Sequence, residues 1–419
     1  MSDDASLTTP RAGGAIGRVT AATVIAAVSG YLVLLLAARH LGAAGYAVFA
    51  VFWAAYGMVT GAQNGQLQET TRAVRAGIDG RVSTARPWVV NATIGVTLGV
   101  LVAATSPLWS GLVFDEHRWL SVALLSVGVA SFGVYAHLAG ALSGAVAWGA
   151  FATLLSVDAM IRLVGAGLAV VFGGDLVAFL VITVIGSVSW MVLLLTSSTA
   201  RAAVGLPGDV SPRRFATNTL TAMAAAAASA VLVMGFPVLI TATDDDASSA
   251  TVGAVVLAVT LTRAPLLVPL NSFQGVLITR FVDGSDRLGA ALRAPAVVVV
   301  AIGVAGSGAA WLIGPWLLQN VFGEDFRLSG LAVAGFTLGA TTLALLTVTG
   351  AATIAVGAHR WYAAGWWIAT LASVGLLLSP ADVVARVTVA LICGPLVGMT
   401  VHAVGLARRR RPAVASARD

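Results

Sequence analysis

The chain alternates between long apolar stretches and short polar segments along its whole length. Twelve stretches approach the roughly 20 residues that a helix needs to cross a membrane. Their apolar residues are continuous rather than alternating, and each stretch is about twice as long as a membrane-spanning strand, which favours helices over a barrel. The predicted spans are residues 19–38, 45–62, 88–106, 119–141, 150–171, 176–197, 215–241, 250–278, 295–317, 328–355, 361–378 and 387–407.

The composition supports this interpretation. Hydrophobic residues make up 58% of the sequence, charged residues only 10%, and the mean hydropathy is +0.93. A soluble domain carries about 25% charged residues, so this chain has too little charge to cover a water-exposed surface. The predicted fold class is an all-α polytopic membrane protein with about 12 transmembrane helices.

The distribution of arginine predicts the orientation in the membrane. All 24 basic residues are arginine, and 18 of them lie in the polar segments that share a side with the N-terminus. Cytoplasmic loops are enriched in basic residues, so both termini are predicted to be cytoplasmic and Asp244 to Asp246 to face outward. Two arginines lie inside spans, and the predicted outer ends hold only four: Arg39, Arg118, Arg327 and Arg386.

The longest polar segments suggest how the spans are grouped. Residues 199–214 contain glycine and proline and separate six spans from six. Residues 63–72, after span 2, and 271–280, at the end of span 8, both carry amides and glycine and close with Thr-Arg, which indicates two parallel repeats. We predict a cytoplasmic tail (1–18), an N-terminal six-helix lobe (19–198), a cytoplasmic linker (199–214), a C-terminal six-helix lobe (215–407) and a basic cytoplasmic tail (408–419).

Several kinds of chemistry lack a sequence signal. The single cysteine, Cys393, and five scattered histidines do not form a metal-binding pattern, so neither metal nor cofactor is predicted. No catalytic constellation is visible, and we expect a protein that is not an enzyme. The basic balance follows from topology and contact with anionic lipids, so membrane lipids rather than nucleic acid are the expected partners.

Arg162 and Arg263 are the candidate functional residues because each lies deep within an apolar span. A charge at that depth is costly and needs an interior position and a partner. Asp158 lies one helical turn before Arg162, so this pair either fixes helix packing or leaves Arg162 available to substrate. Glycines spaced four apart, Gly95 and Gly99, predict a close helix contact.

Arg263 has no acid within a turn on its own helix. Gln274 and Asn271 fall on the same side, and this polar stripe is predicted to bind substrate in the interior. The alternative is that Arg263 pairs with Asp158 across the lobes and locks a closed state. Tyr56, Thr60 and Gln63 form a second stripe that either contacts sugar hydroxyls or hydrogen-bonds between helices.

Short motifs connect the chain to a known family. They are residues 39–49 (Arg-His-Leu-Gly-Ala-Ala-Gly-Tyr-Ala-Val-Phe), residues 143–148, Asp158 with Arg162, and residues 262–265 (Thr-Arg-Ala-Pro). The chain resembles the Wzx-like polysaccharide flippases of the multidrug/oligosaccharidyl-lipid/polysaccharide (MOP) superfamily, although Ala47 stands where glycine is usual. The resemblance implies two six-helix lobes around a central cavity that opens alternately to either side. It also implies a bacterial plasma-membrane protein that moves a polyprenyl-pyrophosphate-linked oligosaccharide to the outer leaflet, with glycan-assembly enzymes as further partners.

A multidrug exporter of the same superfamily is the first alternative, although the only embedded acid, Asp158, already has a basic neighbour. A major-facilitator carrier also has twelve spans, and residues 77–81 faintly resemble its loop signature. A membrane glycosyltransferase or polymerase is the enzymatic alternative, but the predicted outer loops are short.

Overall fold

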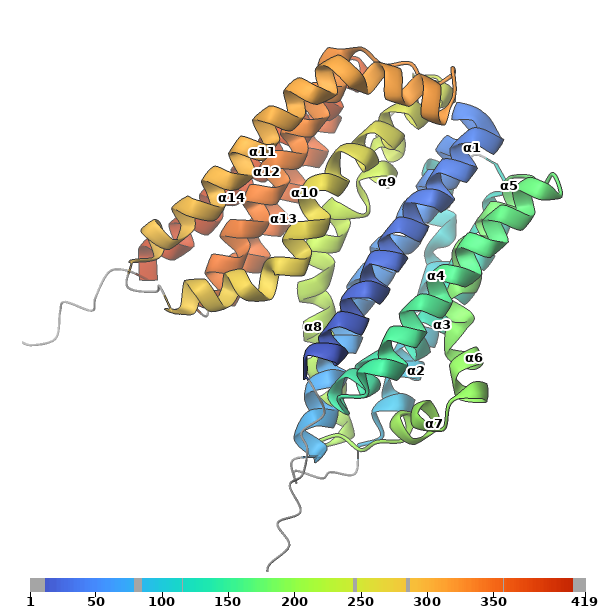
Figure 1. Cartoon of the computed structure of the whole chain (residues 1–419), viewed down its shortest axis with the longest axis vertical. Helices are drawn as coiled ribbons and strands as arrows, with labels where there is room; N and C mark the ends of the chain where they lie inside the picture. Colours follow the sequence, from blue (N-terminus) through green and yellow to red (C-terminus); the bar gives the residue numbers. More distant parts are fainter. Residues whose placement is uncertain are drawn as a thin grey trace, which may run out of the picture. The chain divides into compact units, whose positions relative to one another are not determined.

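A computed structural model of the whole chain describes residues 12–78, 85–114, 116–243, 247–283, 287–356 and 358–409. The secondary structure of these residues is helical throughout (Figure 1). The α-helices are α1 (Ala12–Ile78), α2 (Pro87–Trp109), α3 (Arg118–Gly144), α4 (Trp148–Val171), α5 (Leu176–Ile185), α6 (Ser189–Thr196), α7 (Ser198–Val204), α8 (Pro212–Val233), α9 (Phe236–Ala242), α10 (Ser249–Asp283), α11 (Leu288–Leu317), α12 (Gly330–Ala355), α13 (His359–Leu377) and α14 (Val383–Arg409). Short 3₁₀ turns, η1 (Ser110–Leu112) and η2 (Gly186–Val188), and a π-helical turn, η4 (Leu318–Phe322), complete the helical elements of the described chain.

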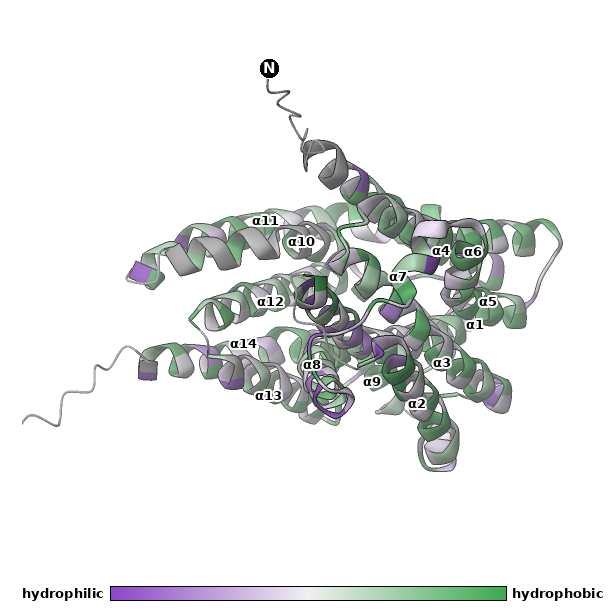
Figure 2. Cartoon of the chain, turned by 90° about the horizontal axis from the view of Figure 1, so that it is seen from below, coloured by the Kyte–Doolittle hydropathy of each residue, from purple (hydrophilic) through white to green (hydrophobic). Residues whose placement is uncertain are grey.

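Each of the twelve predicted spans coincides with helix in this structure. Helix α1 contains spans 1 and 2, α5 to α6 form span 6, and α8 with α9 form span 7. Within the described residues, ten helices are long and apolar enough to cross a membrane, and the longest of them, Gly17–Ile78, includes two spans. Figure 2 shows that the helix bodies are mainly hydrophobic. The predicted all-α, multi-pass membrane fold is therefore confirmed.

Three helices begin directly after a residue whose side chain caps the first turn. Asp175, Ser197 and Ser329 each accept a hydrogen bond from the amide three residues later, at 3.3, 3.2 and 3.2 Å. Such caps satisfy an amide that has no partner within the helix. The caps explain why α5, α7 and α12 begin where they do.

The motif at residues 39–49 forms the turn between spans 1 and 2. Gly42 has φ +66° and ψ 179°, a conformation that side-chain-bearing residues rarely adopt. Arg39 donates hydrogen bonds to the carbonyls of Asn320 (2.8 Å) and Val321 at the end of η4. After the turn, Tyr46 is fully buried with its ring centroid 5.7 Å from that of Phe326. These contacts give the motif a role in the local fold.

The other arginines of the predicted outer ends also hold local structure. Arg118 donates to the Ser110 hydroxyl at 2.7 Å, and Arg327 donates to the Glu324 carbonyl at 3.0 Å. Arg386 donates to the carbonyls of Thr243 (2.9 Å) and Leu377 (3.2 Å), at the ends of α9 and α13. A cation at a helix C-terminus is favoured by the carbonyls exposed there. These contacts give the four arginines of the predicted outer ends a local structural role; the orientation itself stays a prediction.

The chain forms two compact units. Unit 1 comprises Met1–Leu36, Ala62–Ser106 and Trp119–Ala224, and unit 2 comprises Ala37–Gly61, Pro107–Arg118 and Ala225–Asp419. Each unit combines three segments of the chain, so it does not correspond directly to one predicted lobe. The predicted lobe boundaries at residues 199–214 stay a prediction.

Each unit has its own packing. In unit 1 the side chains of Leu138, Leu142 and Leu154 are completely buried in an apolar cluster. A Cβ on Gly95 would lie 3.0 Å from the Cα of Gly133, so the predicted close contact of this glycine is confirmed between α2 and α3. In unit 2, α12 packs against α10, α11 and α14, and α13 packs against α14 (Figure 1).

Candidate functional site

Arg263 lies on α10 in unit 2, with only 7% of its surface exposed. Its Nη1 donates a 2.7 Å hydrogen bond to the Val233 carbonyl at the end of α8. The central carbon of the guanidinium lies 5.0 Å from the ring centroid of Phe236. Arg263 is therefore an interior residue, as its position in an apolar span predicts, and it is attached to span 7.

The Val233 carbonyl is available because span 7 is broken there. Helix α8 ends at Val233 and α9 begins at Phe236, with Pro237 in the first turn of α9. In a continuous helix the amide at position 237 would donate to the carbonyl of residue 233, but proline has no N–H. Arg263 supplies the missing donor from a neighbouring helix, which is how kinked membrane helices are commonly satisfied.

This bond leaves most of the guanidinium unused. Nε and Nη2 of Arg263 are buried and have no hydrogen-bond partner among the described residues. These two atoms form one edge of the guanidinium, with N–H bonds that can meet two oxygens at once. Leaving buried charged donors unsatisfied costs several kcal/mol by order of magnitude, so the edge is suited to an oxoanion. The other members of the predicted stripe, Asn271 and Gln274, have side chains that lie outside the described residues.

Arg162 and Asp158 form the predicted ion pair in unit 1. Nη2 of Arg162 donates to Oδ1 of Asp158 at 2.9 Å, and the two side chains are 15% and 21% exposed. Gly186, in the η2 turn that interrupts span 6, lies directly against this pair: a Cβ there would be 2.6 Å from Asp158 Oδ1. Nothing in the residue pattern singled out Gly186, because its partners are more than 20 positions away.

The contact with Gly186 makes a testable prediction. We expect Gly186→Ala to lower stability by about 1–3 kcal/mol, because the added methyl overlaps the ion pair and helix η2 must shift. Thermal unfolding in detergent measures this. Gly167→Ala is the matched control, since a Cβ at Gly167 on the same helix as Arg162 meets nothing within 4 Å. Equal stability of the two variants would contradict the packing described here.

In the second predicted stripe, Gln63 and Thr60 each donate a hydrogen bond to a backbone carbonyl. Gln63 is completely buried, and its Nε2 donates to the Val129 carbonyl at 3.0 Å, linking α1 to α3 within unit 1. The Thr60 hydroxyl donates to the carbonyl of Tyr56 at 2.8 Å, one turn earlier on the same helix. Tyr56 is 3% exposed. The Gln63 bond joins two helices, and the Thr60 bond lies within α1. A role of Tyr56 and Gln63 in sugar binding stays a prediction.

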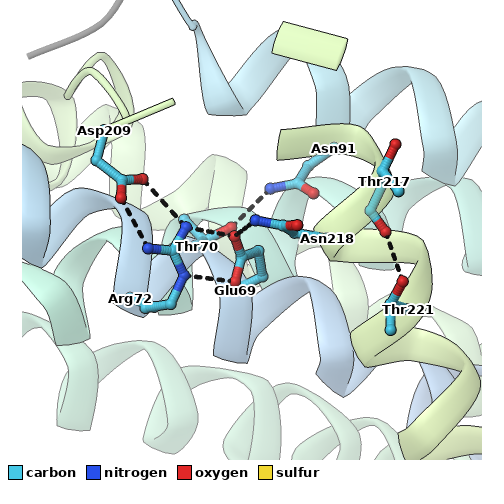
Figure 3. A network of polar contacts seen from close by, with 8 residues as sticks. All are labelled: Glu69, Thr70, Arg72, Asn91, Asp209, Thr217, Asn218 and Thr221. Atoms are coloured by element: carbon cyan, nitrogen blue, oxygen red, sulfur yellow. Dashed lines mark hydrogen bonds and ion pairs between the residues drawn. The ribbon is translucent and has the colours of Figure 1, made fainter. Parts of the chain in front are cut away.

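A polar network that the sequence analysis did not identify lies at the predicted inner end of unit 1 (Figure 3). Arg72 contacts both carboxylate oxygens of Glu69, at 2.6 and 2.8 Å, and both of Asp209, at 2.8 and 3.1 Å. Asn218 on α8 donates to Glu69 at 3.1 Å. The network thus attaches the 199–214 segment and the start of α8 to α1.

Asn91 on α2 extends this network. Its Nδ2 donates to the Thr70 hydroxyl at 2.7 Å and lies 3.3 Å from Nδ1 of His137. Gln66 donates to the Asn91 carbonyl at 3.1 Å, and His137 Nε2 lies 3.0 Å from the Val204 carbonyl. The sequence signal for this network is the polar run at residues 63–72, which by itself indicates only the repeat.

We expect Asn91→Leu to destabilise unit 1 by about 1–3 kcal/mol, because Thr70 and His137 lose a buried partner where water is scarce. Asn91 is completely buried. Asn64→Leu, at an exposed position of α1, is the control and should change little. Thermal unfolding of both variants measures the difference, and an equal effect would show that the network contributes nothing to stability.

Among the described residues no group of three or more histidine, cysteine, aspartate or glutamate side chains could hold a metal ion. Two charged features therefore lie within the predicted spans, each in its own unit: the buried edge of Arg263 in unit 2 and the Arg162–Asp158 ion pair in unit 1.

Comparisons with known proteins identify close relatives. No family model matches the chain. The Mycobacterium tuberculosis uncharacterized protein Rv1510 is 48% identical over 410 residues, which cover 97% of this chain and 94% of the relative. The uncharacterized proteins Rv3630 of M. tuberculosis and Mb3654 of Mycobacterium bovis are each 47% identical over 403 residues, covering 95% of this chain and 93% of theirs. The chain belongs to the family of these mycobacterial proteins.

Solved structures show which fold this family has. An inward-facing multidrug resistance MATE family transporter of the MOP superfamily aligns with TM-score 0.76 and 13% identity, over 96% of this chain and all of the transporter. The lipid II flippase MurJ, in an inward closed conformation, aligns with TM-score 0.68 and 12% identity, over 94% of this chain and 88% of MurJ. A MOP superfamily transporter from Pyrococcus furiosus, described as having a binding pocket of reverse polarity, aligns with TM-score 0.62 and 13% identity, over 95% and 96% of the two chains. The family therefore has the fold of MOP superfamily transporters, as the resemblance predicts.

Proposed function

We propose that this protein is a MOP-type flippase. It moves a polyprenyl-pyrophosphate-linked oligosaccharide, or a related polysaccharide precursor, from the inner to the outer leaflet by alternating access. The fold supports a transport function because it is shared with MATE transporters and with the lipid II flippase MurJ. The bacterial relatives support placement in a bacterial plasma membrane.

The observation that carries the proposal is the buried edge of Arg263. A pyrophosphate that crosses the membrane must keep its negative charge matched, since the hydrocarbon offers no water. Nε and Nη2 of Arg263 are two such donors, buried and without a partner in the described part of the chain. A planar fork of this kind binds phosphate oxygens in pairs, and a buried position makes the interaction stronger.

A multidrug exporter of the same superfamily is the competing function. The TM-score to the MATE transporter, 0.76, exceeds the 0.68 to MurJ. Backbone similarity reports the fold and not the passenger. A cationic drug would also be repelled by a buried guanidinium whose Nε and Nη2 have no partner among the described residues, whereas a pyrophosphate would be attracted.

Leaflet-resolved labelling of the lipid-linked saccharides in a strain lacking the protein distinguishes these functions. We expect a complete lipid-linked oligosaccharide that accumulates on the cytoplasmic leaflet, because assembly is intact and only translocation fails. A normal outer-leaflet pool combined with drug sensitivity would support the exporter instead. A pool that lacks one sugar would support a glycosyltransferase. Glycan-assembly enzymes are the protein partners that the proposal implies.

A further inference from the structure

Two prolines inside helices, Pro107 and Pro395, show how a carbonyl without its usual donor is satisfied in this protein. A proline leaves the carbonyl four residues earlier without its usual donor. At Pro107 the Ser106 hydroxyl donates to that carbonyl, at 2.7 Å, and at Pro395 the Thr342 hydroxyl does so, at 2.9 Å. A neutral hydroxyl is therefore sufficient to satisfy such a carbonyl in this protein.

At Pro237 the same task falls to an arginine. The carbonyl four residues earlier, that of Val233, accepts its hydrogen bond from Arg263 at 2.7 Å. An arginine brings a charge and additional N–H groups into a buried position, where both are costly. One carbonyl needs only one N–H, and the guanidinium carries five, so satisfying Val233 does not account for the rest of the group.

We propose that Pro237 is a positioning residue for ligand binding by Arg263. Pro237 frees the Val233 carbonyl, this carbonyl holds Nη1, and the opposite edge of the guanidinium, Nε with Nη2, is thereby presented to two oxygens of an oxoanion. The identity of that oxoanion as a pyrophosphate rests on the proposed function; the positioning does not.

Phe236 adds a second constraint. Its ring is fully buried and lies 5.0 Å from the guanidinium carbon of Arg263. A hydrogen bond fixes one end of the guanidinium, and the aromatic ring restricts the rest of the group. The break in span 7 thus supplies both contacts, from Val233 and from Phe236, within four residues. A ligand that met this edge would find it already oriented, which lowers the entropic cost of binding.

Binding of farnesyl pyrophosphate to the purified full-length protein in detergent tests the proposal, with farnesol as the uncharged control ligand. Pro237→Ala restores an amide that can pair with Val233, so Arg263 loses its anchor. We expect affinity for farnesyl pyrophosphate to fall about tenfold while folding is retained. Pro395→Ala is the matched control because its carbonyl is held by a threonine, and its affinity should be unchanged. Unchanged or tighter binding by Pro237→Ala would overturn the proposal.

A double-mutant cycle on thermal stability tests the positioning without any ligand. Arg263→Met should lower the melting temperature when Pro237 is present, because the Val233 carbonyl loses the hydrogen bond from Nη1. In the Pro237→Ala background the loss should be clearly smaller, since the new amide satisfies the carbonyl. Equal losses in both backgrounds would refute the coupling of Pro237 to Arg263. If the cycle shows coupling but the wild type does not bind farnesyl pyrophosphate, the positioning stands and the proposed pyrophosphate ligand fails.

Discussion

We expect Arg263→Ala to abolish transport while the protein still inserts and folds. The variant removes both donors of the free edge, and each hydrogen bond to a charged group contributes about 1.5–3 kcal/mol, so substrate affinity should fall by at least two orders of magnitude. Folding should change less. The Val233 carbonyl loses its donor, at a cost of about 1–3 kcal/mol, but a buried and incompletely paired charge is removed at the same time.

Two further variants sharpen this prediction. Arg263→Lys should restore transport only in part, because an ammonium is a single point charge and has no planar fork. Arg214→Ala removes an exposed arginine at the start of α8 and should transport normally. The measurement is transport of a lipid-linked oligosaccharide together with the melting temperature of each variant. Normal transport by Arg263→Ala would show that the substrate contact lies elsewhere.

Arg162→Ala is expected to act mainly on folding. It leaves Asp158 without the guanidinium 2.9 Å away, inside a membrane span. Breaking a buried ion pair on one side costs about 3–5 kcal/mol, and the partial exposure of this pair places the expected loss near the lower end. We therefore expect poor expression and a lower melting temperature.

The neutral double variant Asp158→Asn with Arg162→Gln is the control for this effect. It removes both charges, keeps side chains of similar size and can retain a hydrogen bond across one turn. Much of the lost expression should return. A stable but inactive Arg162→Ala, with no recovery in the double variant, would show that Arg162 contacts substrate and is not primarily structural.

The spans were predictable because hydrophobicity is a property of the local sequence. Twenty consecutive apolar residues have few alternatives to a membrane helix. The pairing of Arg162 with Asp158 could also be predicted from the sequence, since residues four apart share a helix face. The burial of Arg263 followed from the cost of a charge in lipid, without knowledge of any neighbour.

The contacts between helices could not be predicted from the sequence. Asn91 reaches Thr70 and His137 only after three helices pack together, and no spacing rule connects these positions. The sequence does not distinguish Gly186 from other glycines, because its contact with the Arg162–Asp158 pair depends on helix packing. The effect of Pro237 could be predicted only in part. A proline within an apolar span leaves one carbonyl without its usual donor, but the side chain that satisfies this carbonyl depends on packing. The motif at residues 39–49 carries a family resemblance in the sequence, and the structure shows that it forms the turn between spans 1 and 2.

Movement of a lipid-linked oligosaccharide across a reconstituted bilayer tests the central claim most directly. Proteoliposomes containing the purified protein are loaded with a polyprenyl-pyrophosphate-linked oligosaccharide on one leaflet, and an impermeant lectin or glycosidase reports its arrival on the other. The account predicts transfer that depends on the wild-type protein, is lost with Arg263→Ala and is retained with Arg214→Ala. Transfer that is equal with wild type, Arg263→Ala and empty liposomes would contradict it.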